Sequence, residues 1–169
     1  ELVNFPSNWK FCLIDSEVQR NLRSSSYNDR FNELKIAEKE LDVEYLGGVE
    51  LNKFDSNKIS SPTVIKRARH VVTENNRVLR AKECLLKDDI KQFGKLMIES
   101  HDSYSKDFEA STSDVDEIVE RSFQCGALGA RLTGGGFGGF TVSLIEKGTF
   151  PNWYKKINKY YPEEKIFEV

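Results

Sequence analysis

The stretch GARLTGGGFGGFTV, residues 129–142, decides the fold of this 169-residue chain. Residues 140–145 alternate between apolar and polar side chains and include β-branched residues, which predicts a strand. A second strand is predicted just before the glycines, at residues 129–133. The glycine run at 134–139 therefore joins two neighbouring strands.

Five of the six residues from 134 to 139 are glycine. Each glycine loses more backbone entropy on folding than any other residue, and a two-residue hairpin turn needs only one or two of them. The run therefore predicts a backbone that closely approaches a ligand or another loop and offers its N–H groups to anionic oxygens. A tight turn with bulges is the plainer alternative.

Two common nucleotide-binding motifs do not fit the run. Gly134, Gly136 and Gly139 match the spacing G-x-G-x-x-G, but that motif places a pyrophosphate at the start of a following helix, and here a strand follows. No lysine succeeds the glycines as the phosphate loop G-x-x-x-x-G-K-[ST] requires. Both motifs are excluded.

The first third of the chain predicts a strand, a helix and a connecting segment. Residues 9–15 form a buried apolar run typical of a strand. The hydroxyls of serines 24–26 are suited to cap a helix that starts near Tyr27. Gly, Asn, Ser and Pro are mixed over residues 45–61, which predicts a variable connecting segment with a short turn or two.

Three helices are predicted between this segment and the glycine run. One begins at Pro62 and ends near Leu86, and the next begins at Asp88 or Asp89. Ser111, Thr112 and Ser113 are candidate N-caps for the third, Ser113 with Asp116 three residues later resembles a capping box, and Gly126 is placed to end the helix. The spacing of Asp114, Asp116 and Glu117 is typical of charges in a helix's first turn.

A short helix at 151–160 and a closing strand at 165–169 complete the order β, α, α, α, α, β, β, α, β. This order predicts an α+β fold with helices on one face of an antiparallel sheet. A chain of this length is expected to form one domain, residues 1–169.

Composition excludes several classes of partner. Hydrophobic residues make up 38% and charged residues 31%, as in ordinary globular proteins, and the net charge of -2 gives no basic surface for nucleic acid or membranes. No run of 18 apolar residues occurs. Cys12, Cys84 and Cys125 are odd in number and lack metal-ligand spacing, which predicts no zinc site, no disulfides and a reducing, cytoplasmic compartment.

Residues 129–142 resemble the third signature motif of galactokinases, members of the GHMP superfamily that also contains homoserine, mevalonate and phosphomevalonate kinases. Residues 68–74 and 96–101 are similar to further galactokinase segments. Residues 25–30 resemble the stretch in which a tyrosine hydroxyl contacts the sugar. The resemblance implies a GHMP-kinase C-terminal domain with a ferredoxin-like sheet.

The resemblance also implies site residues. Tyr27 is expected to contact galactose, and the active-site glycine loop would comprise Gly134, Gly135, Gly136, Gly138 and Gly139. No catalytic residue and no metal ligand is expected in this chain. The sugar motif, the phosphate loop and the catalytic Asp and Arg of galactokinases belong to an N-terminal ATP- and sugar-binding domain that the chain does not contain.

The implied reaction transfers the γ-phosphoryl group of MgATP to the C1 hydroxyl of galactose and gives galactose 1-phosphate. Its partners are galactose, ATP with Mg²⁺ and the chain's own N-terminal domain, and this fragment alone is expected to be inactive. Three alternatives stay open: a kinase for N-acetylgalactosamine or arabinose, a galactokinase-like sugar-sensing regulator, and an interaction domain without a ligand.

Two histidines and two differences from the galactokinase pattern complete the sequence-based expectations. His70 and His101 titrate near neutral pH, but each lies on an amphipathic helix and is expected to be structural. Phe140 replaces a residue that is usually small in galactokinases, and Phe31 stands where a second arginine is usual. These differences predict altered packing behind the glycine loop and a weaker ion-pair arrangement beside Arg30.

Overall fold

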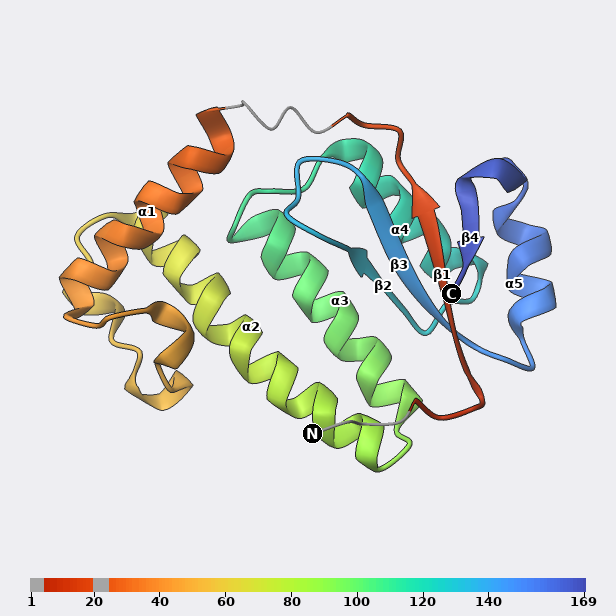
Figure 1. Ribbon diagram of the computed structural model, residues 1–169, viewed down its shortest axis with the longest axis horizontal. Coiled ribbons are helices and arrows are strands. Elements are labelled where there is room, and N and C mark those ends of the chain that lie inside the picture. Colours follow the sequence, from red (N-terminus) through yellow and green to blue (C-terminus); the bar gives the residue numbers. More distant parts are fainter. Residues whose placement is uncertain (1–4, 20–24) are drawn as a thin grey trace.

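The computed structural model describes residues 5–19 and 25–169 and has an α+β architecture (Figure 1). Its strands are β1 (Trp9–Asp15), β2 (Gly129–Leu132), β3 (Phe140–Glu146) and β4 (Ile166–Glu168). They form one antiparallel sheet in the order β2-β3-β1-β4. The predicted strands, the element order and the antiparallel pairing are confirmed.

Five α-helices accompany the sheet. They are α1 (Ser25–Leu41), α2 (Pro62–Leu86), α3 (Ile90–Lys106), α4 (Ser113–Cys125) and α5 (Phe150–Ile157). A single 3₁₀ turn, η4 (Glu163–Lys165), precedes β4. None of the described helices is long and apolar enough to cross a membrane.

The helices lie on both faces of the sheet, and the prediction that they share one face is wrong. Ile145 of β3 packs with α4 and α5, where Trp153 is its largest fully buried neighbour. The next residue towards the start of the strand, Leu144, points to the opposite face and packs on Met97 of α3. Leu144 and Ile145 are both buried because helices cover each side of the strand.

The opposite face is only partly covered. Leu13 lies directly opposite Val142 on one neighbouring strand and Phe167 on the other, so these three side chains share a face. Phe167 is 45% exposed and Val169, at the end of the chain, is 78% exposed. Figure 1 shows α2 and α3 beside this face, over the β2 end of the sheet.

The backbones of α3 and β2 touch directly. A Cβ atom built on Gly129 would lie 2.4 Å from the carbonyl oxygen of Gly94, and one built on Gly94 would lie 2.3 Å from the carbonyl oxygen of Leu128. Both glycines are buried. Only residues without a side chain permit this approach.

The helix ends follow the predicted chemistry with one exception. Asp89 caps α3 by accepting a hydrogen bond from the Gln92 N–H at 3.0 Å, and Gly126 ends α4 with φ +112°. Of the three candidate N-caps of α4, Thr112 is confirmed, because it accepts from the Val115 N–H, and the capping box of Ser113 with Asp116 is wrong. Part of the cap predicted at serines 24–26 lies outside the described residues.

The connecting segment predicted at 45–61 forms three 3₁₀ turns, η1 (Leu46–Gly48), η2 (Leu51–Lys53) and η3 (Ser56–Lys58). It contributes Leu46 and Ile59 to a second hydrophobic cluster, with Ala37 and Leu41 of α1 and Ala68 of α2. This cluster attaches the second half of α1 to α2. The first half of α1 is held differently, by polar contacts.

Candidate functional site

The glycine run forms the turn between β2 and β3. Its backbone has positive φ at Gly134 (85°), Gly136 (84°), Gly138 (115°) and Gly139 (84°), and also at Phe137 (59°). Residues with side chains rarely adopt this region. Conformation therefore accounts for four of the five glycines, and Gly135 is the exception.

Close contacts with neighbouring backbone give a second reason why two of these positions require glycine. A Cβ atom on Gly136 would lie 2.5 Å from the Ala110 carbonyl oxygen, and one on Gly138 would lie 2.5 Å from the Val18 carbonyl oxygen. These same carbonyls accept hydrogen bonds from Phe137 N–H (2.7 Å) and Gly139 N–H (3.2 Å). The glycine turn is thus wedged between the chain after β1 and the loop before α4, and two of its N–H groups are used there.

Tyr27, the expected sugar contact, lies in the first turn of α1 with 59% of its surface exposed. Figure 1 places the start of α1, the glycine turn and the loop before α4 at the same end of the molecule. The fold therefore brings the two sequence-predicted parts of the site to one side, from segments about a hundred residues apart in the chain.

His70 has a structural environment. Its ring is buried, its Nδ1 lies 2.9 Å from the Ser103 Oγ, and it stacks on Phe108 with 4.7 Å between ring centroids. Tyr104 meets it edge-on at 4.8 Å. Burial lowers the pKa of His70 to about 4, so the ring is neutral at neutral pH.

We expect acid to destabilise the fold through His70. The unfolded ring binds a proton near its ordinary pKa of about 6.5, whereas the folded ring resists protonation until about pH 4. Stability is therefore full above about pH 6.5 and falls as the pH drops towards 4, by about 2 kcal/mol at pH 5. Urea unfolding at pH 7.5 and pH 5 measures it. An equal loss in His70→Gln would assign the effect to other groups.

His101 links α3 to both β2 and α4. Its Nδ1 accepts the Leu132 N–H at 3.3 Å and its Nε2 lies 3.1 Å from a carboxylate oxygen of Asp116. Asp116 also accepts hydrogen bonds from Ser105 and Ser111. Asp116 is therefore more than a first-turn charge, because it joins the end of α3 to the start of α4.

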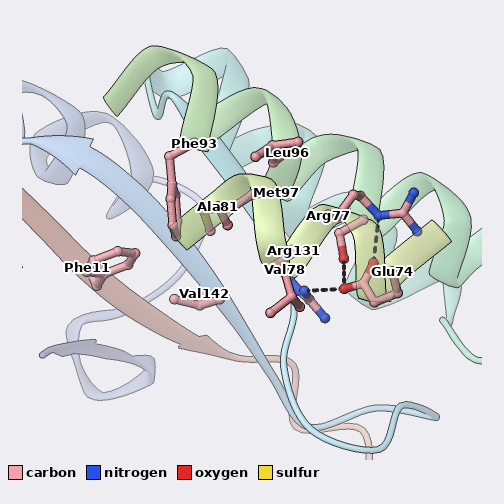
Figure 2. A pocket seen from close by; sticks show the side chains of 11 residues that line it. Phe11, Glu74, Arg77, Val78, Ala81, Phe93, Leu96, Met97, Arg131 and Val142 are labelled. Carbon is pink, nitrogen blue, oxygen red and sulfur yellow. Dashed lines mark hydrogen bonds and ion pairs between the residues drawn. The ribbon is translucent and has the colours of Figure 1, made fainter. Parts of the chain in front are cut away.

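A cavity of about 170 Å³ opens on the partly covered face of the sheet, between α2, α3 and the strands (Figure 2). One end is apolar, with Phe11, Phe93 and Val142. At the other end Arg131 donates to the Glu74 carboxylate at 2.7 Å. Sequence reasoning missed this pair, although both residues lie inside segments that carry the family resemblance.

Glu74 is the centre of a small polar cluster in this cavity. It also pairs with Arg77 (2.7 Å) and accepts from the Ser100 hydroxyl. Burial alone would raise the pKa of Glu74, but the Ser100 hydroxyl and the two guanidinium groups lower it below its ordinary value. The carboxylate is therefore ionised, and it fixes Arg131 immediately before the glycine turn.

The described residues contain no group of three or more His, Cys, Asp or Glu side chains placed to hold a metal ion. The three cysteines are buried free thiols, and burial raises the pKa of Cys12 to about 12.

Comparison with known proteins places this arrangement in a family. The family model described as "GHMP kinases C terminal" matches residues 81–163, which run from α2 through the glycine turn to η4. The chain carries a GHMP kinase C-terminal domain. This confirms the family resemblance and the fold that it implied.

The relatives of this GHMP domain are named galactokinases. It is 38% identical over 170 residues to the galactokinase of Fusobacterium nucleatum, covering 96% of this chain but 44% of the relative. The Enterococcus faecalis galactokinase is 36% identical, with 90% of this chain and 41% of the relative covered. The chain thus spans less than half the length of the curated relatives it matches.

Solved structures agree. The Lactococcus lactis galactokinase complexed with galactose superimposes with a TM-score of 0.86 at 31% identity, over 99% of this chain and 45% of that one. The L. major mevalonate kinase in complex with R-mevalonate has a TM-score of 0.68 at 21% identity, which shows the shared fold.

The structure also places Phe140 and Phe31, the two residues expected to differ from the galactokinase pattern. Phe140 meets Phe167 edge-on, with ring centroids 5.9 Å apart. Phe31 is 55% exposed, and the neighbouring Arg30 still pairs with Glu33 at 2.8 Å. Arg67 of α2 brings a second guanidinium to Glu33, at 2.9 Å.

Proposed function

We propose that this chain is the C-terminal domain of a galactokinase and forms one wall of the cleft in which ATP phosphorylates galactose at its C1 hydroxyl. The observation that carries the proposal is the match along 99% of the chain, at a TM-score of 0.86, to a galactokinase complexed with galactose. Galactose, ATP and Mg²⁺ are then the small-molecule partners, bound mainly by the N-terminal half, in a cytoplasmic enzyme.

Two features of this chain would serve that reaction. The exposed phenol of Tyr27 offers both a donor and an acceptor to a sugar hydroxyl. The glycine turn, comprising Gly134, Gly135, Gly136, Gly138 and Gly139, supplies a rigid backbone floor beside the sugar and phosphates. MgATP supplies the phosphoryl group, and the residues of this chain orient the sugar and exclude water.

The remaining half of the protein would pack on the partly covered face of the sheet. Leu13, Val142 and Phe167 give this face an apolar surface, and the cavity beside Phe11 continues it towards α2. Contiguous apolar surface of this kind marks interaction sites. The named galactokinase relatives are more than twice as long as the part that this chain covers, which supports a second half as the partner.

The 169 residues alone are expected to show no galactose-dependent ATP turnover, whereas the full-length protein is expected to show it. The reason is that this chain contributes no catalytic carboxylate or phosphate loop to the reaction. A coupled ADP assay on both proteins tests this. The isolated chain should also bind the dye ANS more strongly than the full-length protein, through the uncovered sheet face. Turnover by the isolated chain would contradict the proposal.

A sugar panel on the full-length protein separates the alternatives. Preference for N-acetylgalactosamine or arabinose would indicate a different sugar kinase. Binding of galactose and ATP without turnover would indicate a regulator, and no binding at all would indicate an interaction domain. Galactose-dependent turnover above that of the other sugars is the expected result.

Replacing Tyr27 by phenylalanine in the full-length protein is expected to raise the KM for galactose about 3- to 10-fold. This is the effect of losing one hydrogen bond of about 1 kcal/mol while the ring is kept. Steady-state kinetics with galactose and ATP varied separately measures it, with Tyr45→Phe as the control on a tyrosine that is similarly exposed (60%). An unchanged galactose KM in Tyr27→Phe removes Tyr27 from the site.

A further inference from the structure

The segment 107–110, between α3 and α4, contacts the glycine turn at one end. The carbonyl oxygen of Ala110 accepts the Phe137 N–H at 2.7 Å and leaves no space for a side chain on Gly136. Glu109 has φ +53°, a conformation that non-glycine residues keep only where their surroundings fix it. What fixes segment 107–110 therefore also fixes the glycine turn.

The other end of the segment is bound by α1. Arg30 donates from Nε to the Phe108 carbonyl oxygen at 2.6 Å and from Nη1 to Glu33 at 2.8 Å. Arg30 follows Tyr27 by three residues, so the two side chains are neighbours on the helix surface. The hydrogen bonds of Arg30 thus join the helical turn that carries Tyr27 to segment 107–110.

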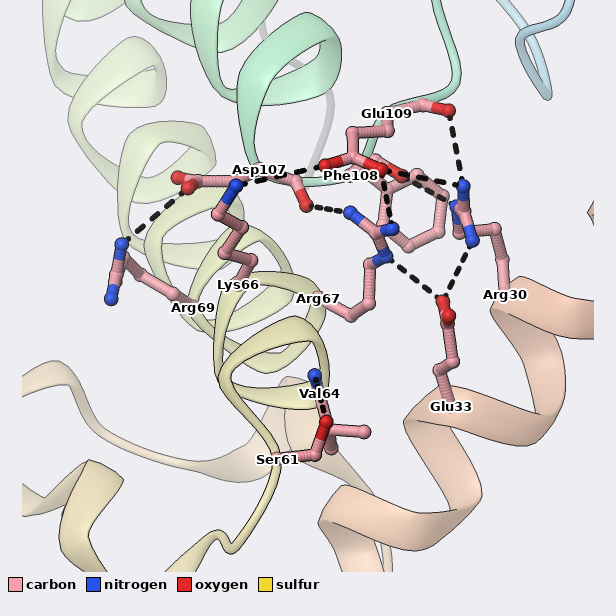
Figure 3. Close-up of polar contacts among 10 residues, drawn as sticks. All are labelled: Arg30, Glu33, Ser61, Val64, Lys66, Arg67, Arg69, Asp107, Phe108 and Glu109. Atoms are coloured by element: carbon pink, nitrogen blue, oxygen red, sulfur yellow. Dashed lines mark hydrogen bonds and ion pairs between the residues drawn. The ribbon is translucent and has the colours of Figure 1, made fainter.

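Arg67 of α2 closes the network (Figure 3). Its side chain is only 2% exposed and uses three nitrogens, donating to Glu33 (2.9 Å), the Asp107 carbonyl oxygen (2.6 Å) and Glu109 (2.7 Å). The Arg67 guanidinium lowers the pKa of the Glu109 carboxyl below its ordinary value. A planar guanidinium can hold several acceptors in one fixed geometry, which an ammonium cannot.

Hydrophobic contacts hold the second half of α1, so the position of its first half depends on the polar network. The hydrophobic cluster between α1 and α2 uses Ala37 and Leu41, with Leu34 packed against it, about two to four turns beyond Tyr27. Glu33 receives both guanidinium groups between that cluster and the start of the helix. The direction of the first turns of α1 thus depends on charged hydrogen bonds with specific geometry.

We propose that Arg30 and Arg67 are positioning residues of the sugar site: through segment 107–110 they hold the start of α1, with Tyr27, at a fixed place relative to the glycine turn. The proposal rests on the proposed function for the role of Tyr27. Neither arginine needs to touch the sugar, because each acts through the backbone of the segment.

The first test measures this geometry without sugar. Cysteines replace Asn28, exposed in the first turn of α1, and Gly135, where an added Cβ meets no atom within 4 Å, in the full-length protein. Spin labels on these cysteines report the distance by electron paramagnetic resonance. We expect Arg67→Met and Arg30→Gln to broaden the distance distribution.

Arg69→Gln is the matched control. Arg69 lies on the same helix, is about half exposed, and among the described residues its guanidinium pairs with the Asp107 side chain at 3.5 Å. It should leave the distribution narrow. If Arg67→Met fails to fold, Arg30→Gln still decides, because Arg30 lies at the edge of the network. An unchanged distribution in the folded arginine variants would overturn the proposal.

The second test uses kinetics of the full-length protein. Arg30→Gln should raise the galactose KM about 10-fold and change the ATP KM less than about 2-fold, since only sugar positioning is lost. In the Tyr27→Phe background the same change should raise the galactose KM less than about 3-fold, because both act through one contact. If the two substitutions instead raise the galactose KM independently, so that their effects multiply, the proposal is overturned. Absence of galactose turnover in the wild type would instead refute the proposed function, and the label distances would still decide the positioning.

Discussion

Replacing Gly129 by alanine is expected to lower the free energy of unfolding by about 3 kcal/mol or more. The new Cβ would lie 2.4 Å from the carbonyl oxygen and 2.6 Å from the Cα of Gly94. These are backbone atoms of the buried residue Gly94, so relief requires α3 to move away from β2. Overpacking of cores costs about 1 to 3 kcal/mol, and rigid backbone neighbours place this case at the upper end.

Gly148→Ala is the control for this substitution. It lies in the turn after β3, and a Cβ there meets no atom within 4 Å. Its free energy of unfolding should stay within about 0.5 kcal/mol of the wild type. Equilibrium denaturation of the chain followed by circular dichroism measures both. A Gly129→Ala protein as stable as the control would show that α3 and β2 do not touch as described.

Replacing Gly136 by alanine in the full-length protein is expected to reduce kcat/KM for galactose phosphorylation at least about 10-fold. Alanine at φ 84° costs about 1 to 2 kcal/mol in backbone strain, and its Cβ would lie 2.5 Å from the Ala110 carbonyl oxygen. The turn relieves this by moving off segment 107–110. A loss of 1.4 kcal/mol in transition-state stabilisation already gives a tenfold effect.

Gly135→Ala separates this effect from any change in the glycine run. Gly135 is its immediate neighbour, lacks a positive φ, and has open space around an added Cβ. Gly135 belongs to the same proposed sugar floor, so its kcat/KM should fall less than that of Gly136→Ala and its thermal unfolding should match the wild type. Steady-state kinetics and thermal unfolding of both variants decide the matter. Equal losses in the two variants would mean that the glycines serve ligand approach and not the contact with Ala110.

Local patterns predicted most of the elements because their causes are local. A proline at position 62 and a serine before it set the start of α2, and Gly126 supplies the left-handed residue that ends α4. The capping box failed by one residue because Thr112 and Ser113 are both suitable caps. Which hydroxyl caps depends on where the chain leaves the preceding loop.

The candidate site was predicted in part. The glycine run identified the turn, and the resemblance proposed Tyr27 and a galactokinase reaction, whose roles remain predictions. Arg67, Glu33 and the pair Arg131–Glu74 were missed because charged residues on helices and strands are usually solvated. Their burial and pairing follow from packing between distant segments, which no spacing in the sequence reports.

The sequence by itself determined the order of elements and the hairpin through the glycine run, because turn chemistry and alternation are encoded within a few neighbouring residues. Its resemblance to galactokinase motifs indicated the GHMP family. Only the tertiary structure decided that helices cover both faces of the sheet and which carbonyl groups the glycines approach. It also decided that Arg67 joins α1 to segment 107–110. These features depend on distances between segments far apart in the chain, and such distances arise only when the core packs.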